Sequence, residues 1–199
     1  MKKILACILA LFSLTFVFSA FAEGDKPTYD FKKFLWGDSR NSIEAVEGEP
    51  FADGKVNGSS TTYIVYETTA VGLDTLLAYY FSNEGLCQIR YLLTEEHSND
   101  NLYIDDYSTF RSALTKKYGE PTLDFISWND DSMKSYYEKN GKSMGDAVSF
   151  GYCTYYTVYL TERTMITMEM SADNYDISTT IDYISNTVTQ EESDFSDEI

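Results

Sequence analysis

The chain has 199 residues, with 15 Lys or Arg against 32 Asp or Glu, so its formal net charge is −17 at pH 7. Aromatic residues make up 16% and charged residues 24%, which is enough apolar material to bury a core and excludes a wholly disordered or collagen-like chain. The acidic balance also argues against nucleic acid as the main partner, because phosphate backbones are held by clustered Lys and Arg.

The N-terminal segment, 1–22, has the pattern of a secretory signal peptide. Lys2 and Lys3 precede an apolar run over residues 4–18, and small residues follow at the positions that a signal peptidase recognises, in Ser19-Ala20-Phe21-Ala22. The alternative is a membrane anchor, because the uncharged stretch 4–22 is about as long as a bilayer-spanning helix. The small residues at the end of the apolar run favour cleavage, and no Cys follows the run to carry a lipid. We therefore predict a secreted protein, extracellular or periplasmic, with no stable membrane anchor.

Cleavage after Ala22 would leave residues 23–199 as the mature chain. Lys2 and Lys3 leave with the signal peptide, so the net charge changes from −17 to −19. The remaining length suits one domain or two small ones. A strongly negative surface keeps a secreted protein soluble and repels anionic membranes and nucleic acids.

The mature chain begins with a polar leader at 23–30, followed by a first predicted α/β repeat at 31–100. In this repeat, residues 31–37 (FKKFLWG) predict a short extended stretch. Ser39 fits the N-cap of a helix, and Gly48 with Pro50 ends that helix because proline cannot continue it.

A loop and three strands complete the first repeat. Residues 51–61 contain two glycines and predict the loop. Strand patterns follow at 62–67, 75–82 and 86–94, and Asn83-Glu84-Gly85 predicts a hairpin turn between the last two.

A second α/β repeat is predicted at 101–186. Asp105-Asp106 opens a helix that ends at Gly119-Glu120-Pro121, the same three residue types as the Gly48-Glu49-Pro50 that ends the first helix. Strand patterns follow at 123–128, 152–160, 164–170 and 177–185, with a helical or irregular insertion at 131–149. The matching order favours a degenerate tandem repeat in an α+β fold, each repeat a short helix or helix pair packed on an antiparallel sheet of three or four strands. Residues 187–199 carry five acids and no base, and predict an acidic disordered tail.

Two cysteines remain after signal cleavage, in a compartment that permits disulfides. Cys87 alternates in phase with Ile89, Tyr91 and Leu93, a pattern typical of a buried face. Buried thiols at Cys87 and Cys153 are therefore favoured, and a single bridge between them stays open.

The sequence contains no recognisable catalytic constellation. His97 is the only histidine and lies in a polar stretch, 95–100, where we expect a solvated loop residue. The neighbouring acids are expected to cap helices and face solvent rather than bind calcium. No catalytic residue, metal ligand or cofactor is predicted, although a carboxylate pair for glycan hydrolysis stays open among so many acids.

The strongest positive signal is a tyrosine-rich strand, YCTYYTVYL at 152–160. Alternation places Tyr155, Thr157 and Tyr159 on one face of it. If Val158 and Leu160 face the helices, these three side chains form an open strip suited to binding a protein. The alternative is that tyrosine serves here only as a good strand former.

Several short motifs resemble a group of exported bacterial proteins of unknown function. They are Phe34-Leu35-Trp36-Gly37-Asp38-Ser39, Val46-Glu47-Gly48-Glu49-Pro50, Lys117-Tyr118-Gly119-Glu120-Pro121, Trp128, Gly145-Asp146-Ala147-Val148, and the terminal hairpin over 164–170 and 181–185. Together they span about residues 31–185. The tandem layout is also similar to the beta-lactamase inhibitory protein and the small outer-membrane assembly lipoproteins. That resemblance implies an open sheet with helices on one face and a protein-binding surface on the other. The lipidated Cys of the lipoproteins is missing, and no functional residue is carried over.

Taken together, these patterns predict a secreted, non-catalytic protein that binds an unidentified protein partner through Tyr155, Thr157 and Tyr159. The alternative is a secreted hydrolase that uses a carboxylate pair on a glycan or peptidoglycan. A third possibility is an envelope or matrix component with no single partner.

Overall fold

The computed structural model describes residues 29–188, so the predicted signal peptide, most of the leader and nearly all of the tail lie outside the described residues. The helices are α2 (Arg40–Glu47), α3 (Asn101–Tyr118), α4 (Asp131–Asn140) and α5 (Met144–Ser149). The strands are β1 (Ala52–Lys55), β2 (Thr62–Ala70), β3 (Leu73–Ser82), β4 (Gly85–Leu93), β5 (Leu123–Trp128), β6 (Cys153–Leu160), β7 (Thr164–Asp173) and β8 (Asp176–Ser185).

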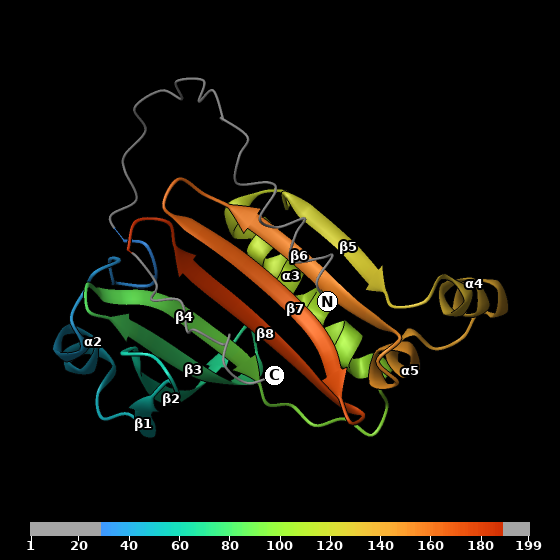
Figure 1. The fold of residues 1–199 in the computed structure, drawn as a ribbon, viewed down its shortest axis with the longest axis horizontal. Coiled ribbons are helices and arrows are strands. Elements are labelled where there is room, and N and C mark those ends of the chain that lie inside the picture. The colour runs from blue at the N-terminus through green and yellow to red at the C-terminus, as the bar shows by residue number, and fades with distance from the viewer. Residues whose placement is uncertain (1–28, 189–199) are drawn as a thin grey trace.

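All eight strands form one antiparallel sheet in the order β1-β2-β3-β4-β8-β7-β6-β5 (Figure 1). From one edge, β1 to β4 follow one another in chain order, and β8 to β5 then continue in reverse chain order to the other edge. Arg90 of β4 lies opposite Asp182 of β8 where the two runs meet. This confirms the α+β class with an antiparallel sheet.

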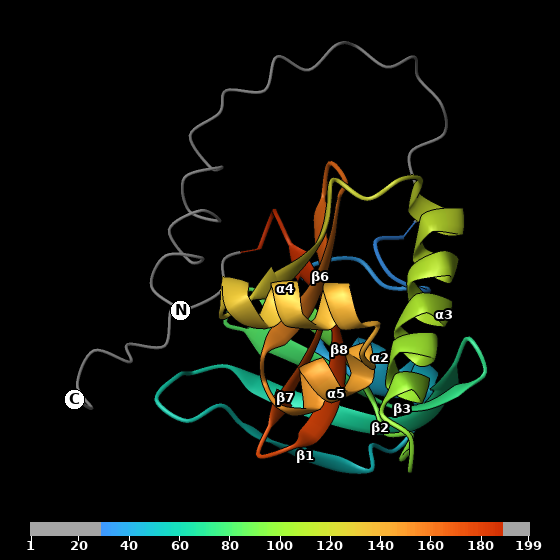
Figure 2. The same cartoon turned by 90° about the vertical axis from the view of Figure 1, so that its right-hand side faces the viewer.

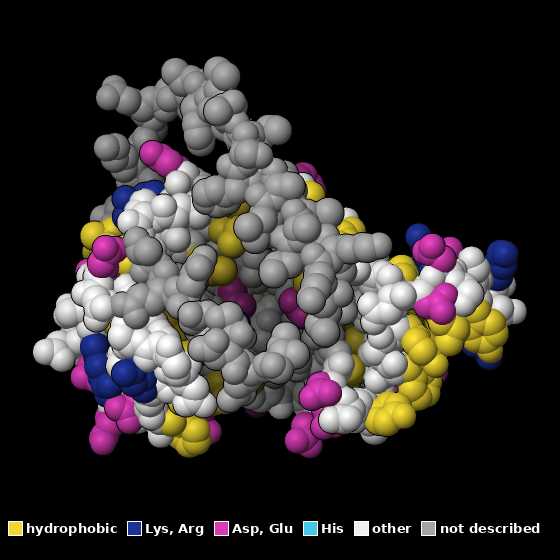
Figure 3. Space-filling model, in the orientation of Figure 1, with side chains coloured by type: hydrophobic (Ala, Val, Ile, Leu, Met, Phe, Trp, Pro, Cys, Tyr) yellow, Lys and Arg dark blue, Asp and Glu magenta, His cyan; other side chains and the backbone are white. Residues whose placement is uncertain are grey.

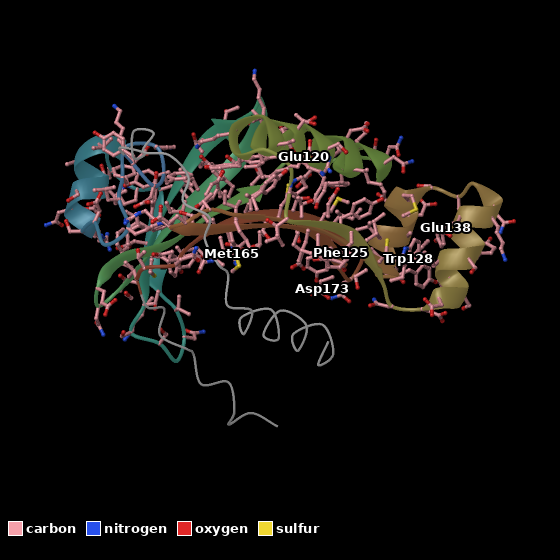
Figure 4. The ribbon with its side chains drawn as sticks, turned by 90° about the horizontal axis from the view of Figure 1, so that it is seen from above. Glu120, Phe125, Trp128, Glu138, Met165 and Asp173 are labelled. Atoms are coloured by element: carbon pink, nitrogen blue, oxygen red, sulfur yellow. The ribbon has the colours of Figure 1, made fainter. Side chains whose placement is uncertain are left out.

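Among residues 29–188, α2, α3 and α5 pack on one face of this sheet, and no helix of this range packs across the other face, which we call the open face (Figures 2 and 4). α3 runs along the covered face, and its buried residues Tyr107, Phe110 and Leu114 meet side chains from the middle strands. α4 lies at the β5 end of the molecule. The covered-face core also contains Ile43, Leu77, Tyr79, Ile166, Met168, Ile181 and Tyr183. Within residues 29–188, no helix has both the length and the apolarity to cross a bilayer.

The predicted N-cap of α2 and the predicted C-terminal ends of α2 and α3 are confirmed. Ser39 caps α2, its hydroxyl accepting a hydrogen bond from the Ser42 N–H at 3.2 Å. Gly48 and Gly119 end α2 and α3 with φ of 91° and 83°, and each donates its N–H to the carbonyl four residues earlier. Glycine adopts this backbone region without a side-chain clash, and the proline two residues later prevents any return to helix.

The first segment of the fold differs from its predicted extended form. Residues 31–37 make a tight turn, with a bridge between Phe31 and Phe34, and Phe31, Phe34 and Trp36 are buried in the core. The carboxylate of Asp30 fixes the turn by accepting the Trp36 N–H and both arms of the Arg163 guanidinium. Local hydrogen bonds form this turn, and the long-range contact of Asp30 with Arg163 joins it to the connection between β6 and β7.

Two further boundaries were predicted wrongly. The loop at 51–61 contains β1, whose Gly54 lies under the Tyr63 ring, where an added Cβ would be 2.6 Å from the Tyr63 hydroxyl. α3 begins at Asn101 rather than at Asp105, because the Asn101 amide oxygen accepts hydrogen bonds from α5, from the Gly145 N–H and the Ser143 hydroxyl. Pairing with β2 therefore defines β1, and a contact 44 residues away in the chain defines the start of α3.

Both cysteines are buried free thiols, which confirms the favoured alternative. The predicted phase of Cys87 is wrong, however, because a β-bulge interrupts the β3–β4 pairing beside it. Leu86 and Ile89 consequently both join the core although they are three residues apart. Burial raises the pKa of the Cys153 thiol to about 11.

Candidate functional site: the open face of the sheet

The three predicted site residues do not form an open strip. Thr157 is fully buried, Tyr159 is 2% exposed, and the Tyr155 ring packs edge-on against Tyr107 of α3 at 5.6 Å. Burial raises the pKa of the Tyr155 hydroxyl to about 12. The structure brings these residues together, but on the face that the helices cover, so their assignment as an exposed binding strip is wrong.

Hydrogen bonding explains why the tyrosines face inward. The Tyr159 hydroxyl donates to the carbonyl of Arg111 and lies 2.9 Å from the Thr115 hydroxyl, both on α3. Thr157 shares a 2.7 Å hydrogen bond with Tyr107 and donates to Asp124. Among the described residues, every buried side-chain hydroxyl has a partner, which allows polar residues to occupy this face. The predicted strip requires Val158 and Leu160 to face the helices, and in the structure they lie on the opposite face.

The opposite residues of β6 consequently lie on the open face. Phe125 of β5 stacks on Tyr156 of β6, with ring centroids 5.4 Å apart and planes 25° from parallel. Leu123 lies opposite Val158, and Leu160 lies opposite Met165 of β7. We call these six residues the β5–β7 patch: Leu123, Phe125, Tyr156, Val158, Leu160 and Met165.

The β5–β7 patch exposes large apolar side chains. The exposed fraction is 37% for Leu123, 44% for Phe125 and 50% for Leu160. Figure 4 shows Phe125 and Met165 on the side of the sheet away from α3. Contiguous apolar residues on a surface are typical of a site that binds another molecule.

A polar cluster separates this patch from the other end of the open face. The Arg90 guanidinium donates to both carboxylate oxygens of Asp182, at 2.7 and 3.0 Å, and the Gln88 amide donates to the same carboxylate at 2.8 Å. The hydrogen bonds to Asp182 raise the pKa of Arg90. The Asp182 side chain is only 11% exposed, so the cluster is a fixed part of the sheet and a poor candidate for catalysis.

A second group of exposed aromatic residues lies at the end of the molecule that carries α4 and α5. Phe150 and Tyr175 are 53% and 68% exposed, and their rings meet edge-on at 5.8 Å. Figure 3 shows hydrophobic side chains gathered at this end. They lie beyond the β5–β7 patch rather than within it.

The carboxylates offer little support for acid–base catalysis. A shallow hollow beside α2 contains Glu44, Glu49 and Asp53, but Arg40 binds two of them, Glu44 at 2.6 Å and Asp53 at 2.8 Å. These hydrogen bonds raise the pKa of Arg40, as expected for a structural ion pair. In the part of the chain that the structure describes, no cluster of three His, Cys, Asp or Glu residues is arranged to bind a metal.

His97 is not the solvated loop residue that the sequence predicted. Its Nε2 lies 2.6 Å from the Asp106 carboxylate, its ring packs edge-on against Tyr103, and its backbone N–H donates to the Tyr103 hydroxyl. His97 therefore anchors the segment before α3 to that helix. The sequence prediction starts this helix at Asp105 and therefore leaves Tyr103 outside it, whereas α3 begins at Asn101 and carries both partners of His97.

No protein-family model, curated protein or solved structure matches this chain. The resemblances stated from the sequence motifs therefore stay predictions. Sequence reasoning missed Phe125 and Tyr156 as site residues. The alternation of apolar residues at 123 and 125 in β5 was the available signal, but only the strand register assigns that face to solvent.

Proposed function

We propose that this chain is a secreted, non-catalytic binding protein that engages a protein partner through the β5–β7 patch. The observation that carries the proposal is the exposure of Leu123, Phe125 and Leu160 beside a stacked Phe125–Tyr156 pair, on a face that no helix of the described residues covers. Aromatic and aliphatic side chains in a contiguous surface group supply the contact area that protein interfaces use. Secretion rests on the pattern of residues 1–22.

We also infer that the fold consists of two degenerate repeats. Arg40 of α2 binds Asp53 of β1, and Arg111 of α3 binds Asp124 of β5, so the same helix-to-edge-strand ion pair occurs twice. The interval from Arg40 to Arg111 equals that from Asp53 to Asp124, and Gly119 follows Gly48 at the same interval again. When the two halves are aligned by strand register, matching positions also have the same residue type. Examples are Tyr66 and Tyr159, Thr75 and Thr164, Ile89 and Ile181, and Tyr91 and Tyr183.

The two repeats differ where the proposed site lies. The edge strand of the first is short and polar, ADGK in β1, whereas that of the second is LDFISW in β5. The apolar patch therefore belongs to the second repeat, while the first retains the shared framework.

The test is partner capture with matched variants of the mature chain, beginning at Glu23. We expect Phe125→Ala combined with Leu160→Ala to lose a stoichiometric protein captured from the envelope and medium of the producing organism. Phe51→Ala is the control, because Phe51 is 65% exposed outside the patch. Capture that survives the double substitution, or is lost equally with the control, would refute the site. Turnover of peptidoglycan or glycan by the purified chain would favour the hydrolase instead.

A further inference from the structure

We propose that the partner contributes an extended segment that pairs with the free edge of β5 as an additional strand, and that this segment is apolar in its middle and basic at both ends. The inference rests on the proposed function, because it specifies the chemistry of the partner at the same end of the sheet. Three observations support it: the backbone groups of β5, its side chains and the charges at its two ends.

The backbone of β5 is available for pairing on one side. β5 pairs only with β6, and no other strand within residues 29–188 lies beyond it. The Asn129 N–H donates to the Tyr152 carbonyl, and hydrogen bonds alternate along an antiparallel strand, so the N–H groups of Phe125 and Ser127 point toward β6. Those of Asp124 and Ile126 point outward. An incoming strand would find two donors and their carbonyls in register.

The side chains of β5 leave this edge accessible. Phe125 on the open face and Ile126 on the other are 44% and 38% exposed. Natural sheets commonly protect an edge with Lys, Pro or a very short strand, and β1 at the opposite edge has four residues that include Gly54 and Lys55. The middle of β5 has no such protection, because its one charged residue, Asp124, is bound to Arg111 and Thr157.

The charged residues around β5 indicate the composition of the partner segment. Residues 118–133 contain four acids and no Lys or Arg. Glu120 lies just before β5, and Asp130 with Asp131 lies just after it. A strand alongside β5 would therefore meet an apolar middle and an acidic group at each end, which favours Lys or Arg at both of its ends.

The same charges disfavour a second copy of this chain. Antiparallel self-pairing centred on Phe125 would place Glu120 of one copy opposite Asp130 of the other, and this would happen twice by symmetry. Like charges directly opposite each other destabilise a strand pair. A heterologous segment with basic ends meets no such repulsion.

The experiment uses two labelled, end-blocked peptides, Lys-Lys-Thr-Val-Thr-Val-Thr-Val-Lys-Lys and its counterpart with Glu in place of every Lys. Fluorescence anisotropy measures their affinity for the mature chain. We expect the lysine peptide to bind at least about tenfold more tightly than the glutamate peptide, with the difference shrinking in salt. No binding of the lysine peptide, or equal binding of both peptides, would overturn the proposal.

Ile126→Pro tests the backbone pairing. Proline removes an outward N–H that β6 does not use and places its ring against an incoming strand, so the fold should survive while the lysine peptide binds about tenfold more weakly. Ile126→Val is the matched control and should bind as the wild type does. Glu120→Lys combined with Asp131→Lys provides a second variant that leaves the strand unaltered, and its preference should shift toward the glutamate peptide. Unchanged affinity in the proline variant would overturn strand addition.

The two proposals fail in different ways. If captured partner survives Ile126→Pro but is lost with Phe125→Ala and Leu160→Ala, the β5–β7 patch binds by its face and strand addition is wrong. If both sets of variants retain the partner, the proposed function itself fails. A concentration-dependent dimer in sedimentation that Ile126→Pro abolishes would assign the edge to a second copy and overturn the proposed partner chemistry.

Discussion

Two tyrosines on one strand offer a direct test of which face of the sheet is open. Tyr159 and Tyr156 both belong to β6 but point to opposite faces. Tyr159 is 2% exposed against α3, whereas Tyr156 stacks on the exposed ring of Phe125. Replacing each with alanine removes the same atoms from the two environments.

The structure gives the expected magnitudes. Tyr159→Ala opens a cavity in the core and should lower the free energy of unfolding by about 3–5 kcal/mol, as large aromatic truncations do. Tyr159→Phe removes only the hydroxyl and its contacts with Arg111 and Thr115, and should cost about 1–2 kcal/mol. Tyr156→Ala loses one partly exposed ring contact and should cost about 1 kcal/mol.

Urea unfolding of the mature chain, followed by near-UV circular dichroism, measures all three values. The burial argument requires Tyr159→Ala to cost at least about 2 kcal/mol more than Tyr156→Ala. Comparable losses for Tyr159→Ala and Tyr156→Ala would refute the assignment of the two faces. A Tyr159→Ala protein that keeps its stability and loses only its partner would restore the strip that the sequence first predicted.

Two further predictions concern ionisation and the N-terminal turn. Burial raises the pKa of Cys153 from 9.0 to about 11, so the protonated thiol stabilises the fold below pH 9 and this contribution is lost as the pH rises toward 11. Between pH 8 and 10.5 the wild type should lose about 2 kcal/mol more than Cys153→Ala in urea unfolding, and parallel pH profiles would contradict this. Asp30→Ala leaves the Trp36 N–H and the Arg163 guanidinium without their acceptor and should cost about 2–3 kcal/mol. Arg163→Ala leaves the 4% exposed Asp30 carboxylate without its cation but keeps its hydrogen bond from the Trp36 N–H, so it should cost less than Asp30→Ala, about 1–2 kcal/mol, and equal losses would show that the ion pair alone accounts for the effect.

Much of the fold was predictable because it is encoded locally. Gly48 and Gly119, each followed by a proline two residues later, end two helices by backbone chemistry that requires no distant partner. Alternating apolar residues marked seven of the eight strands within a few residues. The exception, β1, has the sequence ADGK, which carries no apolar alternation and becomes a strand only because β2 lies beside it.

The candidate site was less predictable, because a strand pattern assigns residues to two faces without saying which face is covered. Hydrophobicity placed Val158 and Leu160 inward, but the hydroxyls of Thr157 and Tyr159 find partners on α3 and Asp124. Those partners belong to other elements, well before β6 in the chain. A prediction based on side-chain polarity alone therefore assigns the buried and exposed faces of β6 the wrong way round.

The sequence by itself determined the α+β class, the antiparallel strands and the C-terminal ends of α2 and α3, because glycine, proline and apolar periodicity act over a few residues. Only the tertiary structure decided which face of β6 is buried, that Asp30 joins the turn at 31–37 to Arg163, and that β5 lies at an edge. Each of these depends on hydrogen bonds between segments distant in the chain. Their energies are realised only once the sheet and α3 have come together.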